Sequence, residues 1–365
     1  MSKIRVGLIY GGRSGEHEVS ILSANSVISA IDRQKYDVIP IGITKEGRWL
    51  PGQSPAPLVE SKELQVRLLS SSSVNEPIPL ISHQKQGEIL SGILEKVDVI
   101  FPVMHGPFGE DGTIQGLLEL ADIPYVGGGV LASSVGMDKA LMKAVFLQNG
   151  LPVGDYLVYL RKEWRSNPER VLNEIEQRIS YPCFIKPANL GSSVGISKAH
   201  QRNELKMSLD LAAEYDRKIV VEKMLNGKEV ECGVLGNDEP KASIPGEIVP
   251  CTEFYDYEAK YILNDSKLII PAEISPELTR KVQDLAIHSF KAVDCAGLAR
   301  VDFFVDEAKN EIYVNEINTI PGFTKISMYP KMWEATGISY TELIDRLLQL
   351  AVERYEDKKQ NKISS

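Results

Sequence analysis

The stretch LARVDFFVDEAKNEIYVNEIN, residues 298–318, contains two runs in which successive side chains alternate between two sets. A period of two is typical of β-strands, whose successive side chains point to opposite faces of a sheet. The polar residues 306–310 between the runs predict a hairpin loop. The stretch therefore predicts two antiparallel strands, and in the second strand Ile312 and Val314 are expected on the same face as Glu316.

A hairpin centred on Lys309 places residues at equal sequence distance from it opposite each other. The expected pairs are Asp302 with Glu316 and Arg300 with Asn318 on one face, and Val301 with Ile317 and Val305 with Tyr313 on the other, apolar face. Two carboxylates directly opposed across a sheet repel each other by roughly 0.2 to 1 kcal/mol, and by more when they are partly buried. A divalent cation would turn this repulsion into attraction, so the polar face is a candidate metal site.

The ligands that this face offers, from Asp302, Glu316 and Asn318, are oxygen atoms, and no Cys or His lies nearby in the sequence. Hard oxygen ligands favour Mg²⁺ or Mn²⁺ over Zn²⁺. Mg²⁺ bound by few side chains completes its octahedral shell with water and phosphate oxygens, so the stretch indicates a nucleotide site. The alternative is an exposed hairpin whose charges face solvent.

Length and composition are those of a globular protein with several domains. At 365 residues the chain exceeds one compact core and predicts two or three domains. Its 43% hydrophobic and 25% charged residues are ordinary, and no apolar run reaches the roughly 20 residues that span a bilayer. The net charge of −9 argues against a general nucleic-acid binder. The apolar residues 4–10 are too few for a signal peptide and predict a first strand.

The four cysteines are Cys183, Cys232, Cys251 and Cys295. They show neither CxxC spacing nor histidine partners at the distances of a metal finger. We expect reduced core thiols in a cytosolic protein.

Residues 1–127 alternate strand and helix patterns, which favours a mostly parallel α/β domain. The expected strands are residues 4–12, 37–43 and 97–103, the expected helices are residues 19–31 and 113–121, and residues 51–73 are expected to form a surface excursion. Ligands of such sheets bind at the carboxyl ends of strands, where the glycine-rich loops at residues 11–18 and 105–112 are expected. His105 in the second loop is either a hydrogen-bonded loop histidine or a substrate contact. The first loop, GGRSGE, does not match GxGxxG, which argues against a dinucleotide site.

Three glycines at residues 127–129 mark a boundary, after which residues 135–148 predict a helix. The strand expected at residues 182–186 leads into a loop of small residues, 187–195, that lacks the GK[ST] of a Walker A motif. This loop either donates backbone N–H groups to phosphates beside the fixed charge of Lys186, or is an ordinary hairpin turn.

Residues 218–222 predict an apolar strand that becomes polar over residues 222–227. Such a segment could hold an adenine ring, although the sequence alone favours a plain junction of strand and loop. Residues 250–261 contain three tyrosines and a lysine without an apolar face, and predict a functional loop. Helices are expected at residues 276–293 and 340–357.

Several motifs, in a fixed order, cover nearly the whole chain. They are GEHEVS (residues 15–20), HGPFGEDG (105–112), MDK (137–139), GSSVG (191–195), YDYEAKY (255–261), RVD (300–302) and NEINTIPG (315–322). Together they resemble the D-alanine:D-alanine ligases of the ATP-grasp superfamily, and the insertion at residues 51–86 resembles the longer of the two bacterial forms. Each motif alone is unspecific, whereas the ordered combination is highly specific.

This resemblance implies an α/β ATP-grasp fold with an N-terminal parallel α/β domain (residues 1–127), a central α+β domain (128–223) and a C-terminal α+β domain (224–365). It implies an enzyme that ligates two D-alanine molecules to D-alanyl-D-alanine with ATP, releasing ADP and phosphate, for the synthesis of peptidoglycan precursors. It also implies two Mg²⁺ or Mn²⁺ ions, a cytoplasmic location and a homodimer, with no nucleic-acid or membrane partner.

The resemblance also implies roles for residues by their place in the motifs. Asp302, Glu316 and Asn318 would hold the two metal ions, and Lys139, Lys186 and Lys260 would contact phosphates. Glu222, Lys223 and Leu225 would bind adenine, and Glu229 would bind ribose. Glu16 would bind the ammonium of the first D-alanine with His105 near its carboxylate, and Ser327 would hold the carboxylate of the second. Arg300 and the Gly322 N–H would face the oxyanion, while Glu16, Ser192 and Tyr261 would form a hydrogen-bonded link that closes the loop over the site.

The chemistry of these residue types suits amide formation. A carboxylate is a poor electrophile until transfer of a phosphoryl group from ATP makes an acyl phosphate, which the second amine attacks. Lysines and Mg²⁺ neutralise charge in the first step, and Arg300 with a backbone donor would stabilise the tetrahedral oxyanion in the second. No side chain stands out as the base for the attacking ammonium, and a phosphate oxygen of the substrate is the alternative.

Three other functions fit less well. A D-alanine:D-lactate ligase is the nearest, but Lys260 and Tyr261 resemble the type that forms a dipeptide. A nucleotide or amino-acid binding protein without turnover has little use for an oxyanion donor such as Arg300 beside the metal residues. A nicotinamide dehydrogenase would need GxGxxG, which is absent from the first loop.

Overall fold

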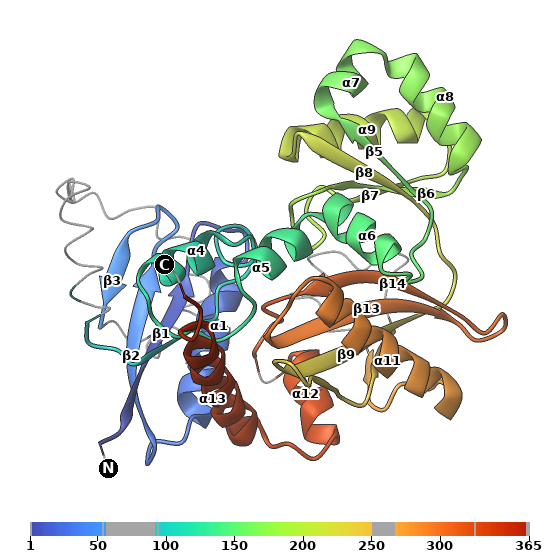
Figure 1. Cartoon of the computed structure of the whole chain (residues 1–365). Helices are drawn as coiled ribbons and strands as arrows, with labels where there is room; N and C mark the ends of the chain where they lie inside the picture. The colour runs from blue at the N-terminus through green and yellow to red at the C-terminus, as the bar shows by residue number, and fades with distance from the viewer. Residues whose placement is uncertain are drawn as a thin grey trace.

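The computed structural model describes residues 2–52, 55, 92, 95–249, 267–324 and 326–362. Within these ranges the strands form three sheets, and Figure 1 shows the second of them in an upper lobe above the third, with the first to one side. The predictions for residues 56–86 and 250–261, which include Lys260 and Tyr261, lie outside the described residues, as does Cys251.

The first sheet has the strand order β3-β2-β1-β4. Its strands are β1 (Ile4–Gly11), β2 (Tyr36–Ile43), β3 (Trp49–Pro51) and β4 (Val99–Pro102), and its helices include α1 (His17–Ala30) and α4 (Thr113–Leu120). Because β1 runs parallel to β2 and β4, the predicted parallel α/β arrangement is confirmed. Leu8 packs with residues of α1, whereas Ile9 packs with residues of α4. Helices therefore cover both faces, as is usual for parallel strands.

The second sheet has the strand order β5-β8-β6-β7, and all of its pairs are antiparallel. Its elements are β5 (Tyr156–Leu160), α7 (Arg161–Ser166), α8 (Pro168–Arg178), β6 (Cys183–Pro187), β7 (Ser197–Ala199), α9 (Arg202–Tyr215) and β8 (Lys218–Lys223). On β6, Cys183 and Ile185 are buried in the core beneath these helices. Phe184 and Lys186 point the other way and line a cavity, so the two-residue period of the strand separates the core from the candidate site.

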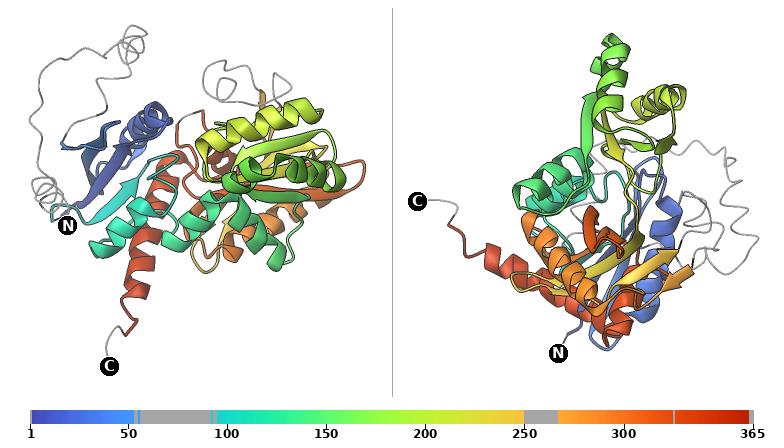
Figure 2. Two further views of the ribbon diagram at one scale, coloured as in Figure 1. Left: turned by 90° about the horizontal axis from the view of Figure 1, so that it is seen from above. Right: turned by 90° about the vertical axis from the view of Figure 1, so that its right-hand side faces the viewer.

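The third sheet is antiparallel, with the order β12-β11-β9-β13-β14 and β10 paired to β9. Its strands are β9 (Lys228–Gly236), β10 (Lys241–Ala242), β11 (Gly246–Val249), β12 (Lys267–Ile269), β13 (Gly297–Asp306) and β14 (Glu311–Asn318), and the helices beside it include α11 (Pro276–Ala292) and α12 (Met328–Ala335). Val282 and Phe290 of α11 pack against Val301 and Phe303 of β13 in one core cluster. Figure 2 shows the same arrangement of layers from above and from the side.

The prediction of a single helix at residues 135–148 is wrong. The structure has two helices instead, α5 (Val130–Met137) and α6 (Lys139–Gln148). They are separated by Asp138, whose backbone is extended and whose carboxylate accepts hydrogen bonds from the N–H groups of Ala140 and Leu141. Aspartate is a preferred N-cap, so the MDK motif begins a new helix rather than continuing the previous one.

The hairpin of β13 and β14 follows the expected register only at the end that is far from its connecting loop. Asp302 pairs with Glu316, as predicted. The register then shifts between Asp302 and Phe303, which leaves Asn315 as an extra residue on β14. This β-bulge reverses the phase of alternation beyond it, because one strand gains a residue that has no partner on the other.

Two expectations fail because of this bulge. Val305 pairs with Ile312, and not with Tyr313. Ile312 and Val314 are buried in the core, on the side opposite to Glu316, although strict alternation would place them on the same face. The bulge thus turns the last part of β14 so that its acidic residue faces the cavity while its apolar residues remain in the core.

The C-terminal helix α13 (Tyr340–Lys358) packs against the first sheet, to which Figure 1 shows it adjacent. Leu343 and Leu347 belong to the same buried cluster as Leu8 of β1. Arg354 donates to the carbonyls of Tyr125, at 3.2 Å, and of Gly127. The beginning and the end of the chain therefore share one core.

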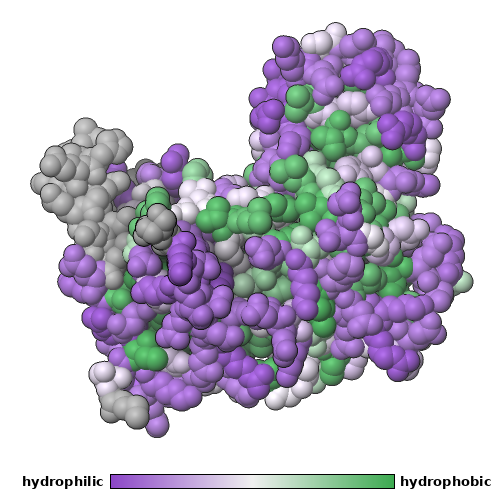
Figure 3. Space-filling model, in the orientation of Figure 1, coloured by the Kyte–Doolittle hydropathy of each residue, from purple (hydrophilic) through white to green (hydrophobic). Residues whose placement is uncertain are grey.

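Surface polarity differs between regions of the molecule. The upper lobe is mostly hydrophilic, whereas apolar surface crosses the middle of the molecule over α5 and α6 (Figure 3), where Leu131, Leu141 and Leu147 are exposed. The described cysteines, Cys183, Cys232 and Cys295, are buried free thiols, as predicted for core residues. In the described ranges no helix is both long and apolar enough to cross a bilayer.

Candidate active site

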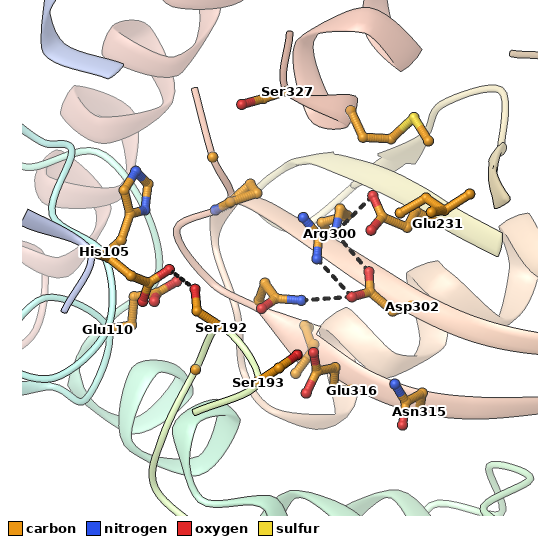
Figure 4. Close-up of a pocket in the computed structure, with 18 of the residues that line it drawn as sticks. His105, Glu110, Ser192, Ser193, Glu231, Arg300, Asp302, Asn315, Glu316 and Ser327 are labelled. Carbon is orange, nitrogen blue, oxygen red and sulfur yellow. Dashed lines mark hydrogen bonds and ion pairs between the residues drawn. The ribbon is translucent and has the colours of Figure 1, made fainter. Parts of the chain in front are cut away.

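A cavity of about 1690 Å³ lies where residues of the three sheets and their loops meet. The residues expected at the site that line it are Glu16, His105, Lys139, Lys186, Ser192, Glu222, Lys223, Leu225, Glu229, Arg300, Asp302, Glu316, Asn318, Gly322 and Ser327. They come from segments far apart in the sequence, and part of the arrangement is drawn in Figure 4. Every expected site residue within the described ranges is thus at this cavity.

The polar face of β13 and β14 carries a network of charges. Nε and Nη2 of Arg300 donate to the two oxygens of Asp302, each at 2.7 Å, and Nε lies 3.1 Å from a Glu231 oxygen (Figure 4). Asn318 donates to Asp302 at 3.0 Å. Burial alone would lower the pKa of Arg300, but Asp302 and Glu231 raise it well above its ordinary value. Arg300 is therefore a permanent cation fixed on the wall of the cavity.

Lys139 connects this acidic face to the loop of small residues. It is the first residue of α6, and its ammonium lies 3.6 Å from a Glu316 oxygen. The same ammonium donates to the carbonyl of Leu190 at 2.8 Å. A cation thus stands between the loop and the paired carboxylates, where the phosphates of a nucleotide would need it.

The residues on this face fit a divalent cation of the Mg²⁺ type. Asp302 and Glu316 are directly opposed, and with Asn318 they offer oxygen ligands only. Among the residues that the structure describes, no group of three or more His, Cys, Asp and Glu is placed to hold a metal ion. Two carboxylates and one amide leave half of an octahedral shell to water and phosphate oxygens, which is how Mg²⁺ binds beside nucleotides.

A second cluster of charges lies on the second sheet. Glu222 accepts a hydrogen bond from Lys186 at 2.7 Å, and its other oxygen lies 3.2 Å from the ammonium of Lys143. Burial would raise the pKa of this carboxyl, but the two lysines outweigh burial and lower it to about 2. Burial lowers the pKa of Lys143, whereas Glu222 and Glu316 outweigh burial at Lys186 and raise its pKa. Lys186 therefore carries its charge into the cavity.

The loop of small residues has a strained backbone. Ser192 and Ser193 have φ values of 49° and 59°, in the left-handed region that serine rarely adopts. The hydroxyl of Ser192, a residue labelled in Figure 4, donates to the carboxylate of Glu16, which also lines the cavity. The predicted link between Glu16 and Ser192 is therefore present, while the third member, Tyr261, lies outside the described residues. Strain of this kind gathers at functional sites.

The loop after β4 brings His105 to the cavity as a buried residue. Its Nδ1 lies 3.1 Å from the carbonyl of Ile320, which can only accept, so Nδ1 donates and Nε2 accepts from Ser23, also at 3.1 Å. Burial lowers the pKa of His105, although Glu16 opposes this shift. His105 is therefore neutral at neutral pH, in one defined tautomer.

Glu110 lies in the same loop. It accepts a hydrogen bond from the N–H of Gly106 at 2.7 Å. Burial, together with the negative charge of Glu16, raises the pKa of Glu110 to about 8. Glu110 is therefore mainly protonated at neutral pH, which leaves Glu16 as the negative charge that can attract an ammonium group.

The segment after β14 approaches the cavity closely. A Cβ added to Gly322 would lie 2.9 Å from Oγ of Ser327, so this backbone and this hydroxyl share one small space. The same hydroxyl accepts from the N–H of Thr324 at 3.0 Å.

Near β8, the N–H groups of Lys223 and Met224 already donate to the carbonyls of Asp155, at 3.0 Å, and Pro182, at 3.3 Å. An adenine ring would therefore not receive hydrogen bonds from these two groups.

Comparison with known proteins shows the family of the chain. Family models described as the N-terminus and the C-terminus of D-ala D-ala ligase match residues 5–128 and 145–349. The chain belongs to the D-alanine–D-alanine ligase family. It is 55% identical to the D-alanine–D-alanine ligase of Ruminiclostridium cellulolyticum, over 98% of this chain and 97% of that one, and 50% identical to that of Natranaerobius thermophilus, over 99% and 98%.

Solved structures of ligases have the same fold. The structure of the D-alanine–D-alanine ligase from Coxiella burnetii matches with a TM-score of 0.81 and 36% identity, over 99% of this chain and 97% of that one. VanG D-Ala:D-Ser ligase from Enterococcus faecalis matches with a TM-score of 0.78 and 37% identity, over 96% and 100%. The expected α/β ATP-grasp fold of the ligase family is thereby confirmed.

The sequence analysis did not single out three residues near the cavity. Glu110 and Glu231 line it, and Lys143 lies behind Glu222. Glu231 follows Glu229 by two residues on β9, and Lys143 follows Lys139 by one helical turn on α6. This spacing predicts that each residue lies on the same face as its expected neighbour. That spacing alone does not separate a buried charge from an exposed one.

Proposed function

We propose that the reaction of this family, the ATP-dependent joining of two molecules of D-alanine, takes place in this cavity. As a member of the family the chain is an ADP-forming ligase, and its product, D-alanyl-D-alanine, is a precursor of peptidoglycan. The observation that carries the placement is the position of Lys139, whose ammonium contacts both the loop carbonyl of Leu190 and the carboxylate of Glu316. It places cationic and acidic groups together, as phosphoryl transfer from ATP requires.

ATP would lie between the second and third sheets. Lys139 and Lys186 would hold its phosphates, with Lys260 from outside the described residues, while Glu222, Lys223 and Leu225 would surround adenine and Glu229 the ribose. Because Glu222 is held by two lysines, its part is to fix Lys186 as much as to contact the base. Two Mg²⁺ or Mn²⁺ ions held by Asp302, Glu316 and Asn318 would neutralise phosphate oxygens.

The first D-alanine would bind with its ammonium at Glu16 and its carboxylate near the neutral His105. Transfer of the γ-phosphoryl group of ATP to an oxygen of that carboxylate would make an acyl phosphate and release ADP. Since acyl phosphates hydrolyse readily, the contact between Ser192 and Glu16 would help to exclude water from this step. We propose that Tyr261 extends this contact.

The second D-alanine would bind with its carboxylate at Ser327. Its amine would attack the acyl carbon to form a tetrahedral intermediate, and phosphate would leave as the peptide bond forms. A guanidinium has five N–H groups, so Arg300 can donate to the oxyanion in addition to its bonds with Asp302. The N–H of Gly322 would be the second donor. The proton of the attacking ammonium would pass to a phosphate oxygen of the substrate.

We also propose three domains, residues 1–127, 128–223 and 224–365, working as a homodimer in the cytoplasm. The division is supported by the sheets, since β1 to β4, β5 to β8 and β9 to β14 each fall within one of these ranges. The homodimer and the cytoplasmic location rest on the family resemblance.

The decisive experiment is phosphate release from ATP and Mg²⁺ with different substrates. We expect release with D-alanine alone, and none above background with L-alanine. Addition of D-lactate or D-serine to D-alanine tests for a mixed product, which mass spectrometry would identify. Release that depends on either added compound, or that occurs equally with L-alanine, would refute the assigned substrate.

A further inference from the structure

Lys143 is a buried cation that the proposed roles do not use. Its side chain is 4% exposed, and it lies on α6 behind the wall of the cavity. The ammonium lies 3.2 Å from a Glu222 oxygen and donates to the backbone carbonyl of Asn315 at 3.3 Å. It also lies 6.0 Å from the ring centre of Tyr156. Burying an ammonium is costly unless such partners compensate it, so these contacts define where Lys143 can lie.

The partners of Lys143 belong to two different sheets. Glu222 is on β8 of the second sheet, where its other oxygen accepts from Lys186. Asn315 is on β14 of the third sheet. One ammonium therefore connects the strand that carries the phosphate-binding cation Lys186 to the strand that carries Glu316.

The carbonyl that Lys143 contacts belongs to the bulge of β14. Asn315 is the extra residue there, and the bulge turns Glu316 to the cavity while Val314 remains in the core. β-bulges near active sites often redirect a side chain in this way. A cation that holds the carbonyl of the bulged residue holds the orientation of its neighbour Glu316 as well.

We propose that Lys143 is a positioning residue. Through Glu222 it would fix Lys186, which contacts the phosphates of the nucleotide, and through the carbonyl of Asn315 it would fix the bulge that points Glu316 toward the same nucleotide. The inference rests on the proposed binding of ATP between the second and third sheets. Lys143 itself would not touch ATP, because Glu222 lies between it and the cavity. Its effect would therefore appear in nucleotide affinity, and the sites for D-alanine, which lie beside Glu16 and Ser327, would be unaffected.

The test compares Lys143→Met, which keeps length and removes charge, with Lys143→Arg, which keeps charge. Arg354→Met is the matched control, since Arg354 also donates to backbone carbonyls and lies over a tyrosine ring, 4.3 Å from the ring centre of Tyr125, but does not line the cavity. Binding of ADP is measured by calorimetry without D-alanine, and KM values for ATP and D-alanine are measured by phosphate release. Lys143→Gln repeats the test if the Met variant does not fold.

We expect Lys143→Met to weaken ADP binding and to raise the KM for ATP by roughly 10- to 100-fold, the usual effect of losing a residue that orients ligands. The KM for D-alanine should stay within about twofold, since no contact to that site changes. Lys143→Arg should restore most of the affinity, and Arg354→Met should lower only the melting temperature. A Met or Gln variant that folds and binds ADP like the wild type would overturn the inference. Wild-type enzyme without turnover of D-alanine would instead overturn the proposed function.

Discussion

Replacing Glu222 by glutamine should reduce the free energy of unfolding by about 3 kcal/mol at neutral pH. The substitution keeps the shape of the side chain and removes the charge that lies between two buried ammonium groups, those of Lys143 and Lys186. The folded protein without this charge would contain two like charges with no carboxylate between them. We therefore expect a large loss of stability in the protein without ligand.

The magnitude follows from the pKa of Glu222. Burial would raise it, but attraction by Lys143 and Lys186 prevails and lowers it from 4.5 to about 2. At about 1.4 kcal/mol for each unit of pKa, the folded state favours the charged carboxylate by about 3 kcal/mol relative to the unfolded chain. This agrees with the roughly 3 to 5 kcal/mol that is lost when one member of a buried ion pair is removed.

The pH dependence gives the sign of the effect. Because the pKa of Glu222 is lower in the folded protein than in the unfolded chain, the stabilisation is complete above about pH 4.5 and is lost as the pH falls toward 2. The difference between wild type and Glu222→Gln should therefore be greatest at neutral pH and should shrink on acidification.

Urea unfolding followed by circular dichroism at several pH values measures this difference. Glu174→Gln is the control, since Glu174 also lies between two cations, Arg170 at 3.2 Å and Arg178 at 3.4 Å, but its side chain is 31% exposed. Exposed pairs contribute about 0.2 to 1 kcal/mol each, so this variant should lose little. Equal losses in the two variants, or a Glu222→Gln deficit that grows in acid, would refute the reasoning.

Two further predictions concern the acids of the cavity. The wild type should lose stability as the pH rises from 4.5 through about 8, because the pKa of Glu110 is higher in the folded protein than in the unfolded chain, and Glu110→Gln should remove this loss. Melting temperatures of both proteins across this pH range measure the difference. Parallel curves of melting temperature against pH would contradict the raised pKa. Asp302→Asn should lower turnover at least about tenfold and raise the Mg²⁺ concentration needed for half-maximal phosphate release. Unchanged turnover and an unchanged Mg²⁺ requirement would show that Asp302 is not a metal ligand.

The local part of the site was predictable from the sequence. Alternation with a polar loop predicted the pairing of Asp302 with Glu316, although the assumed register is wrong between Phe303 and the loop, and the bulge at Asn315 is what brings the two carboxylates opposite each other. The bulge at Asn315 was not predictable, because a single inserted residue leaves both strands rich in alternating side chains. It is packing of Ile312 and Val314 against the core that decides where the phase changes.

The parts that depend on burial were also beyond the sequence. A lysine one turn after Lys139 would suit an exposed helix face as well as a buried one. Lys143 can be buried only because the fold places Glu222 and the carbonyl of Asn315 beside its ammonium. In the same way, the raised pKa of Glu110 comes from its depth and from Glu16, which is remote in the sequence. The motif around Glu110 was recognisable, but its protonation state was not.

The shared core of α13 and the first sheet has a consequence for synthesis of the protein. Ribosomes release the amino terminus first, so β1, β2 and β4 emerge long before Leu343, Leu347 and the rest of α13. Until the last helix is made, one side of that sheet lacks part of its cover, and apolar residues such as Leu8 and Phe101 are open to other chains. A stop codon shortly before residue 340 would therefore yield a truncated chain that aggregates, rather than a shorter active enzyme.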